Sequence, residues 1–200
     1  MIRALALVSM SALALAACQP PAEPTPAPSE PPVTTPTTPV DSNAVTAEGW
    51  GPLRVGMTIP EITAALGPDA DPNAVGGADP ASCDEFRPER APENLRVMVV
   101  DGRLARISLS EGSTLKTDRG FGVGDSAASI KTAYGTAATV TPHKYQSAPA
   151  EYITAWTGAA PADMDPAPTA RGIVYEIGAN GNVMAIHAGG PAIRYVEGCS

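Results

Sequence analysis

The sequence has little of the chemistry that most enzymes and metalloproteins use. It contains two histidines and three cysteines among 200 residues, and aromatic side chains make up 4%. No histidines or cysteines stand at the paired spacing of a zinc site. The Gly-x-Ser-x-Gly, His-Glu-x-x-His and Gly-Lys-Ser motifs of common hydrolases and nucleotide-binding proteins are absent. The sequence therefore predicts a protein that is not an enzyme and that holds neither a cofactor nor a metal.

Positive charge is also scarce. Lysine and arginine number 13 against 21 aspartates and glutamates, which gives a formal net charge of -8. Nucleic-acid binding needs a basic surface, and so does an electrostatic grip on anionic lipid. We therefore predict no nucleic-acid partner. The acidic balance is compatible with a cationic partner, although it is also an ordinary means of keeping a surface soluble.

The sequence lacks the run of roughly 20 apolar residues that a membrane-spanning helix needs. Its main apolar run covers residues 4–14 and follows Arg3, which is typical of a secretory signal peptide. The run ends at residues 15–18, Leu-Ala-Ala-Cys, which resemble the lipobox of bacterial lipoproteins. The resemblance implies that residues 1–17 are cleaved off and that the sulfur and the new amino group of Cys18 are lipidated.

This anchor decides the predicted location. Several acyl chains hold a protein in a bilayer stably, whereas a single chain does not. Gln19 stands where many inner-membrane lipoproteins have aspartate, so the same resemblance favours the outer membrane. We predict a lipid-anchored, periplasm-facing protein of the cell envelope whose first partner is the lipid bilayer. An ordinary signal peptide that happens to contain a cysteine is the alternative.

Residues 18–48 are predicted to link that anchor to the rest of the chain. The segment after Cys18 is dense in proline, threonine, alanine and serine and has almost no large apolar side chain. Such a chain cannot bury enough surface to offset its ordering entropy, so we predict a disordered, semi-rigid Pro-rich arm. In polyproline-like form the arm would reach about 90 Å. A ligand for an aromatic groove is the weaker alternative.

Two stretches of the remaining chain share one pattern, at residues 55–67 and 123–135. Each has glycine at its second position, an N-capping threonine or serine at its fourth, and a closing glycine. These signals predict two short helices, and strand-like sequence follows each of them. We predict an α+β fold of two tandem units, residues 49–115 and 116–200, each a helix with antiparallel strands, packed together as one domain.

Each predicted unit contains a hairpin signal, Asp101-Gly102 in the first and Asn180-Gly181 in the second. With two-residue turns there, one face of the first hairpin collects Met98, Val100, Ala105, Ile107 and Leu109. One face of the second collects Ile173, Tyr175, Ile177, Met184, Ile186 and Ala188. The other side of the first hairpin, with Val97, Val99 and Leu104, is also apolar, so we expect the other unit to cover it. We expect a loop at residues 158–170 and an extended segment at residues 192–196.

The cysteines predict one disulfide bond. Three cysteines reduce to two once Cys18 carries lipid, and an exported chain meets an oxidising compartment. We therefore predict that Cys83 pairs with Cys199, with their Cα atoms within about 7 Å. The bond would tie the first unit to the end of the chain. The alternative, a reactive thiol, has no Cys-x-x-Cys motif or neighbouring histidine to support it.

The two histidines keep one alternative function open. His143 falls in a predicted loop or strand start, and His187 alternates with Ile186 onto the less apolar face of its hairpin. Surface histidines are the simpler interpretation, and a base for a serine nucleophile is the other. An envelope hydrolase of unfamiliar design is therefore the alternative. A concave pocket that joins either histidine to a serine and a carboxylate would favour it.

The first helix signal carries a family resemblance. Gly56-Met57-Thr58, Ile62 and Leu66-Gly67 resemble the Gly-Met-Thr…Val…Leu-Gly motif of the SmpA/OmlA (BamE) small outer-membrane lipoproteins. The tandem arrangement is similar instead to the β-lactamase inhibitory protein, which repeats a helix-and-sheet unit. This second resemblance implies a layered α+β fold with helices on one face of an antiparallel sheet. The second copy departs from the motif, with Gly124-Asp125-Ser126.

These patterns together predict a function of binding rather than catalysis. We expect an outer-membrane-anchored envelope lipoprotein that acts as a protein-binding or scaffold module. Envelope assembly and inhibition of an exported enzyme are the two variants that the resemblances imply. The expected partner is an envelope protein that the sequence does not identify.

Overall fold

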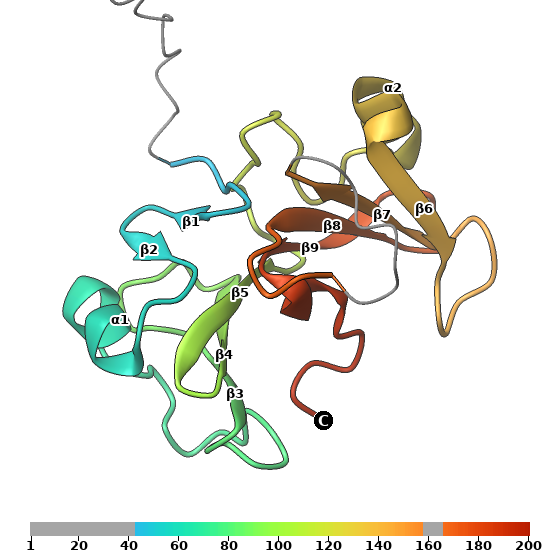
Figure 1. Cartoon of the computed structure of the whole chain (residues 1–200). Coiled ribbons are helices and arrows are strands. Elements are labelled where there is room, and N and C mark those ends of the chain that lie inside the picture. Colours follow the sequence, from blue (N-terminus) through green and yellow to red (C-terminus); the bar gives the residue numbers. More distant parts are fainter. Residues whose placement is uncertain (1–42, 158–165) are drawn as a thin grey trace, which may run out of the picture. The chain divides into compact units, whose positions relative to one another are not determined.

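The computed structural model describes residues 43–157 and 166–200 (Figure 1), and all of them belong to one compact unit. The predicted signal peptide, Cys18 and the predicted arm as far as residue 42 lie outside the described residues. So do residues 158–165 of the predicted loop. None of the helices in the described ranges is long and apolar enough to cross a membrane.

A seven-stranded antiparallel sheet forms the centre of this unit, in the order β3-β4-β5-β9-β8-β7-β6. Its strands are β3 (Cys83–Phe86), β4 (Leu95–Val100), β5 (Arg103–Leu109), β6 (Ala138–Pro142), β7 (Glu151–Trp156), β8 (Gly172–Ile177) and β9 (Val183–Gly189). Two short strands, β1 (Gly49–Trp50) and β2 (Leu53–Arg54), pair separately. The predicted hairpins are β4–β5 and β8–β9, and they meet where β5 pairs with β9.

Both predicted helices are present, as α1 (Ile59–Leu66) and α2 (Ala127–Tyr134). Their N-caps are Thr58 and Ser126, and glycine ends each of them with a positive φ. Both helices contribute to one apolar core on the same face of the sheet. Figure 1 shows α1 towards the β4 end of the sheet and α2 towards the β6–β7 end. The mixed α+β class is confirmed.

The loop before each helix is joined to a hairpin by the same pair of backbone hydrogen bonds. The donors and acceptors are Gly56 to Leu104 (2.7 Å), Leu104 to Met57 (2.7 Å), Gly124 to Val183 (2.8 Å) and Val183 to Asp125 (2.9 Å). Gly56 and Gly124 have φ values of 93° and 91°, a region that strongly favours glycine. The local sequence that predicts the helices therefore also connects each of them to its hairpin.

The first hairpin contains an extra residue that the alternation pattern does not reveal. Val99 pairs with Leu104, but Met98 pairs with Arg106, so Ala105 has no partner on β4. Such a β-bulge puts two residues opposite one and reverses the facing of every residue beyond it.

The reversal moves Ile107 and Leu109 to the face that the helices cover, where both are fully buried. The prediction that they share a face with Met98 is therefore wrong. Met98 lies on the opposite face, which we call the second face, in a small cluster with Ala192 and Cys199. Val97, Val99 and Leu104, on the other side of this hairpin, are buried in the main core.

The second hairpin also has a bulge, near its turn. Glu176 pairs with Ala185 and Ile177 pairs with Val183, so Met184 is the extra residue and is 41% exposed. The prediction that Met184 faces the core is wrong. The other residues predicted for that face are buried in the main core: Ile173, Tyr175, Ile177, Ile186 and Ala188.

Both ends of the described chain depart from the expected boundaries. Val45 and Ala47, inside the predicted linker, are buried in the main core. At the other end, the expected extended segment 192–196 is wrong, because a short 3-10 helix, η2 (Pro191–Arg194), occupies most of it. Pro191 at its start suits a helical first turn, where a missing N–H costs little.

Candidate functional site

The strand register gathers polar side chains on the second face. On one row across the sheet, Ser108 stands opposite His187, which stands opposite Val174, and the row continues to Thr154 and Thr139. On a neighbouring row, Glu176 stands opposite Tyr152, which stands opposite Thr141. Side chains in such rows point to the same side of a sheet. Polar groups from β5, β9, β8, β7 and β6 therefore lie together on the second face.

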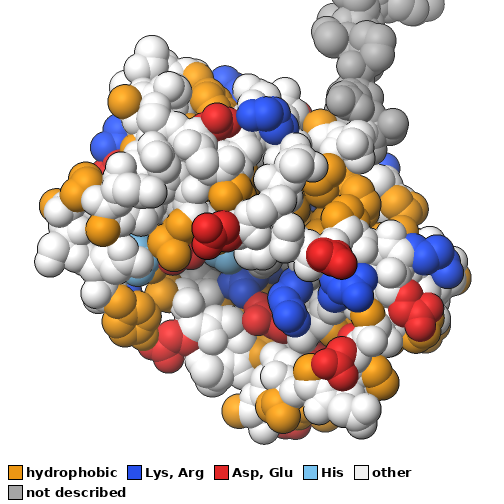
Figure 2. Space-filling view, turned by 180° about the vertical axis from the view of Figure 1, so that it is seen from behind, with side chains coloured by type: hydrophobic (Ala, Val, Ile, Leu, Met, Phe, Trp, Pro, Cys, Tyr) orange, Lys and Arg blue, Asp and Glu red, His pale blue; other side chains and the backbone are white. Residues whose placement is uncertain are grey.

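A cavity of about 200 Å³ lies over these rows. Strands β6 to β9 form its floor and residues 193–196 of the C-terminal segment form its roof. Its lining residues are Thr141, Pro142, Lys144, Tyr152, Thr154, Val174, Glu176, His187, Ile193, Arg194, Tyr195 and Val196. Figure 2 shows pale-blue histidine atoms close to red and blue side chains in a hollow of the surface.

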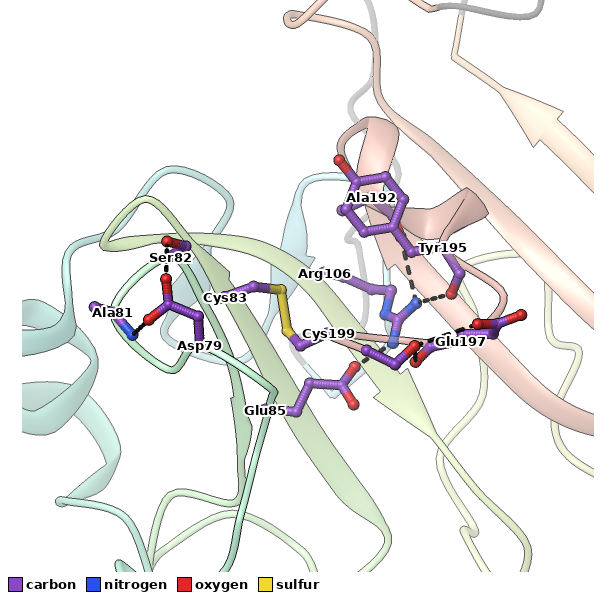
Figure 3. The surroundings of a disulfide bond; sticks show 11 residues. Asp79, Ala81, Ser82, Cys83, Glu85, Arg106, Ala192, Tyr195, Glu197 and Cys199 are labelled. Atoms are coloured by element: carbon purple, nitrogen blue, oxygen red, sulfur yellow. Dashed lines mark hydrogen bonds and ion pairs between the residues drawn. A yellow bond between two sulfur atoms is a disulfide. The ribbon is translucent and has the colours of Figure 1, made fainter.

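A disulfide bond holds the end of the roof segment. Cys83 at the start of β3 is bonded to Cys199, with their Cα atoms 5.3 Å apart (Figure 3), so the predicted pairing is confirmed. The bond connects the outermost strand of the first hairpin's side of the sheet to the end of the chain. Gly77 packs against it so closely that a Cβ there would lie 2.8 Å from the Cys199 Cβ.

Arg106 holds the roof from below. Its guanidinium donates hydrogen bonds to the carbonyls of Ala192 (3.3 Å) and Tyr195 (2.8 Å) and forms an ion pair with Glu85 (Figure 3). Arg106 is only 4% exposed. Burial lowers the pKa of its guanidinium, and the Glu85 carboxylate opposes that shift. An arginine buried in this way is stabilised by bonding its neighbours, and these bonds fix η2 over the sheet.

A third attachment lies at the open side of the roof. Glu197 accepts hydrogen bonds from the Lys144 ammonium and from the Tyr145 hydroxyl. The hydrogen bond with Glu197 raises the pKa of Lys144, and the hydrogen bond with Lys144 lowers the pKa of Glu197. All three groups are exposed, so we assign this contact a small share of the stability.

His143 is buried rather than exposed, so its interpretation as a surface histidine is wrong. Its Nδ1 accepts from the backbone N–H groups of Tyr145 (3.0 Å) and Gln146 (3.2 Å). The proton of the neutral ring is therefore on Nε2, which lies 3.0 Å from Glu176 Oε1. The ring also stacks on Tyr152, with 4.7 Å between centroids.

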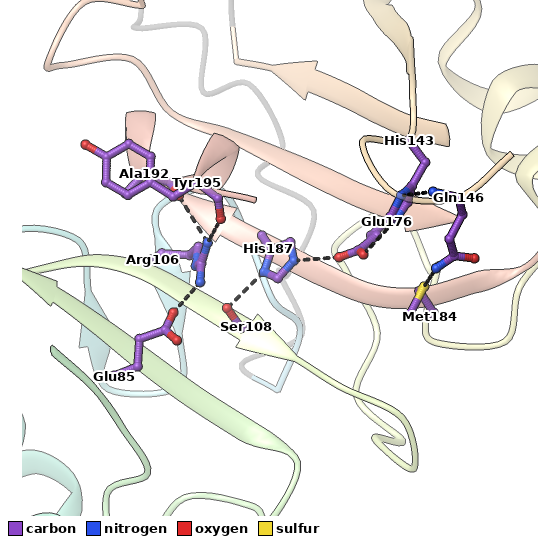
Figure 4. Close-up of polar contacts among 10 residues, drawn as sticks. All are labelled: Glu85, Arg106, Ser108, His143, Gln146, Glu176, Met184, His187, Ala192 and Tyr195. Atoms are coloured by element: carbon purple, nitrogen blue, oxygen red, sulfur yellow. Dashed lines mark hydrogen bonds and ion pairs between the residues drawn. The ribbon is translucent and has the colours of Figure 1, made fainter. Parts of the chain in front are cut away.

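His187 is the second partner of the same carboxylate. Its Nε2 lies 3.3 Å from Glu176 Oε2, and its Nδ1 lies 2.9 Å from the Ser108 hydroxyl (Figure 4). The side chain is 17% exposed, and burial lowers the pKa of its imidazole. The neutral ring donates from Nε2 to the carboxylate, so Nδ1 accepts the Ser108 proton. His187 is therefore not a free surface histidine either.

Glu176 carries the charge at the centre of this site. Hydrogen bonds, first from His187 and then from His143, lower the pKa of its carboxyl group despite partial burial, so it is ionised at neutral pH. Within the described part of the chain it is hydrogen-bonded by these two imidazoles, and its close contacts include no lysine or arginine. The Tyr152 hydroxyl beside it is shut off from solvent and completes no hydrogen bond with a described residue.

The arrangement supports binding more directly than catalysis. Ser108, His187 and Glu176 are connected in series, as in a serine hydrolase, but Ser108 lies inside strand β5 and is not among the described lining residues of the cavity. A substrate in the cavity would therefore contact the carboxylate end of the series first. Among residues 43–157 and 166–200, no three histidine, cysteine, aspartate or glutamate residues are placed to hold a metal ion.

The disulfide bond and the two histidines stand out in the sequence, whereas Glu176, Ser108 and Arg106 were not predicted as site residues. Alternation along the second hairpin already places Glu176 and His187 on one face, so that pair was predictable from the sequence. Ser108 and Arg106 were not, because they reach this site only through the pairing of β5 with β9 and the bulge in β5.

Comparison with known proteins found no family model, no curated protein and no solved structure that matches this chain. The resemblances to the SmpA/OmlA lipoproteins and to the β-lactamase inhibitory protein therefore remain predictions.

Proposed function

We propose that this protein is a lipid-anchored envelope module that binds a protein partner through the cavity on its second face. The observation that carries the proposal is the fixed roof. A disulfide bond, the Arg106 hydrogen bonds and the Glu197 contacts hold the C-terminal segment over a cavity. A site held in shape before its ligand arrives loses less entropy when the ligand binds.

The anchor and the arm supply the setting for this module. The lipobox resemblance ending at Cys18 supports lipid attachment, and the outer membrane is the favoured location. A Pro-rich arm between Cys18 and the folded unit would let the unit meet partners at some distance from the bilayer. Cys18→Ala is expected to release the protein from membranes or leave it uncleaved. A processed Cys18→Ala protein in the membrane fraction would contradict the anchor.

We also propose that the folded unit arose from two copies of one helix-and-hairpin unit. The support is the repeated connection, in which Gly56 and Gly124 each begin the same pair of backbone hydrogen bonds. The β-bridges Thr58 to Arg103 and Ser126 to Asn182 join each N-cap to the start of a second strand or its turn. This leaves the binding function on one copy, because the cavity lies over β6 to β9.

Site-specific photo-crosslinking in the native envelope tests the partner proposal. A photo-reactive residue at Val196, which lines the cavity and is 44% exposed, is expected to form an adduct with an envelope protein. Val75, exposed in a loop between α1 and β3, is the matched control and is expected to form none. Thr154→Met should fill the cavity and weaken the Val196 adduct at least fivefold. Equal adducts at both positions, or none, would contradict the proposal.

The second candidate is an envelope hydrolase, which the series Ser108–His187–Glu176 specifically favours. An imidazole that accepts the serine proton and donates to a carboxylate is the arrangement that activates a serine nucleophile. A fluorophosphonate probe would then label the wild-type protein but not Ser108→Ala or His187→Gln. Ser129→Ala, an exposed serine in α2, is the control and should be labelled normally. An unlabelled wild-type protein would exclude this candidate.

A further inference from the structure

We infer that the cavity on the second face receives a primary ammonium group at the end of an alkyl chain, as in a lysine side chain of the partner. The inference rests on the proposed function, because it names the chemistry by which a protein partner would be recognised.

The charge of the cavity floor favours a cation. Glu176 is ionised, and both of its described partners are neutral imidazoles, so its negative charge is not balanced by a direct ion pair. A half-buried carboxylate in a cavity attracts a cation more strongly than an exposed one does, because the local dielectric constant is lower. The site therefore has a place for one positive charge at its floor.

The nearby cations do not take that place. Arg106 is paired with Glu85 and directed to the roof carbonyls, and Lys144 is paired with Glu197 at the rim. Arg194 also lines the cavity and has a contact of its own. Lys144 and Arg194 both line the cavity and would repel a diffuse positive surface, so the ligand that fits is a single ammonium on a narrow chain.

The hydrogen-bond acceptors of the cavity suit an ammonium group. An ammonium group has three donors and no acceptor, so it needs several oxygen atoms around it. The cavity offers the second lone pairs of Glu176 and the hydroxyls of Thr141 and Thr154. An anion placed at the same depth would instead face the carboxylate.

The apolar part of the lining suits an alkyl chain. Pro142, Val174, Ile193 and Val196 also line the cavity. Lysine buries its methylene groups against apolar surface while its charged end reaches polar partners. A cavity of about 200 Å³ is smaller than the roughly 300–1,000 Å³ of sites for drug-sized molecules, so it suits one side chain.

Calorimetric titration of the full chain, purified from membranes in a non-ionic detergent, tests the inference. The probe is N-acetyl-lysine methylamide, and the matched uncharged probe is N-acetyl-norleucine methylamide. The wild-type protein is expected to bind the lysine probe and not the norleucine probe. Glu176→Gln, which keeps the shape and an acceptor oxygen, should weaken binding at least tenfold. Glu111→Gln, a change at an exposed carboxylate, should leave binding unchanged.

Two further measurements keep the outcome decisive. Thr154→Met should abolish binding of the lysine probe while Glu176 stays in place, which covers the case in which Glu176→Gln does not fold. Equal binding by wild type and Glu176→Gln, or binding of N-acetyl-glutamate methylamide instead, would overturn the inference. Binding to phosphatidylethanolamine vesicles without binding of the lysine probe would also overturn it, because the ammonium group would then come from lipid.

The proposed function and this inference can fail separately. If Val196 still crosslinks to an envelope protein while no lysine probe binds, the ammonium inference is wrong and the partner proposal stands. If the lysine probe binds and no crosslink forms, the cavity chemistry stands and the protein-partner proposal is wrong.

Discussion

The two hairpins of the sheet share one connection to their helices but differ on the second face. Under the C-terminal segment, β4 and β5 present Met98 and Ala105, which pack into an apolar cluster with Cys199. Strands β8 and β9 present Glu176 and His187, which line the cavity. The same helix-and-hairpin scaffold therefore supports two different regions on the second face of one sheet: an apolar region that the C-terminal segment covers, and a polar region that lines a cavity.

The C-terminal segment joins the apolar region and the polar region of the second face. It begins after β9, crosses the sheet as η2, and ends bonded to Cys83 on the first hairpin's side. Arg106 lies between the apolar cluster and the cavity and binds the segment in its middle. Arg106 and Cys83, from the side of the first hairpin, therefore hold the segment that covers the polar region beside the second hairpin.

Breaking the disulfide bond is the change with the largest expected effect. The two cysteines are 116 residues apart, and closing a loop of this size contributes about 4–5 kcal/mol in the chain-entropy model. The double variant Cys83→Ala/Cys199→Ala should melt about 10–15 °C lower but still fold, since the sheet core remains. Calorimetry in detergent measures the melting temperature. The wild-type protein in reductant also lacks the disulfide bond and should show the same decrease.

The same double variant sharpens the comparison between the faces. Because Cys199 holds the roof, amide hydrogen exchange in residues 193–199 should become faster, whereas exchange in α1 and α2 should rise only with the global loss of stability. Unchanged exchange in the roof would mean that Arg106 and Glu197 hold the segment without the disulfide bond.

The two helices can be compared by removing one core side chain from each. Ile62 and Ile130 occupy corresponding positions of α1 and α2, and both are fully buried. Ile62→Ala and Ile130→Ala should each cost about 2–5 kcal/mol. Denaturant titration followed by tryptophan fluorescence and by circular dichroism should give one coincident transition for each variant, because both helices cover one core. Two separate transitions in either variant would show that the halves unfold independently.

The local features of this fold were predictable because local sequence determines them. Thr58 and Ser126 before the helices, glycines after them, and Asp101-Gly102 in a turn act within a few residues. The Cys83–Cys199 bond followed from the compartment and from having two available thiols.

The facing of the strands was only partly predictable. Ala105 and Met184 are ordinary strand residues by sequence, and nothing local marks them as the extra residues of bulges. The candidate site depends further on β5 pairing with β9, a contact between distant segments that alternation cannot predict. That pairing brings Ser108 to His187 and positions Arg106 under the roof.

Acidification should destabilise the polar region around His187 before it destabilises the rest of the protein. Burial lowers the pKa of His187 in the folded state, so its contribution to stability is fully present above the unfolded value of about 6.5 and is lost as pH falls through the folded value. Stability should therefore fall as the pH is lowered from 7 to 5. His187→Gln, which does not titrate, should remove that slope.

Protonation of the carboxylates Glu176 and Asp125 should lower the stability further, in a separate and lower pH range. Glu176 and Asp125 have pKa values lowered in the folded state, so their contributions are present above the unfolded values and are lost as pH falls through the folded ones. A His187→Gln protein that keeps the wild-type slope between pH 7 and 5 would contradict the assignment to His187. Urea titrations at each pH measure both windows.

The smallest expected effect separates the two helix N-termini. Ser126 accepts a hydrogen bond from the Ser129 N–H (3.2 Å), whereas at α1 the Glu61 carboxylate accepts from the Thr58 N–H (2.7 Å) and the Thr58 hydroxyl (2.8 Å). Ser126→Ala removes its cap and should cost about 1 kcal/mol. Thr58→Ala leaves Glu61 bonded to the backbone and should cost about half as much.

Acid should weaken the N-terminus of α1 more than that of α2, because only the contact between Thr58 and Glu61 depends on an ionised group. The Thr58 backbone hydrogen bond lowers the pKa of Glu61, so the contact is intact above the unfolded value and is lost as pH falls through the folded value. Amide hydrogen exchange in the first turns should therefore speed up in α1 relative to α2 between pH 5 and 3, after correction for intrinsic rates. Glu61→Gln should abolish the difference. Equal acceleration in both helices would mean that the two N-termini are capped alike.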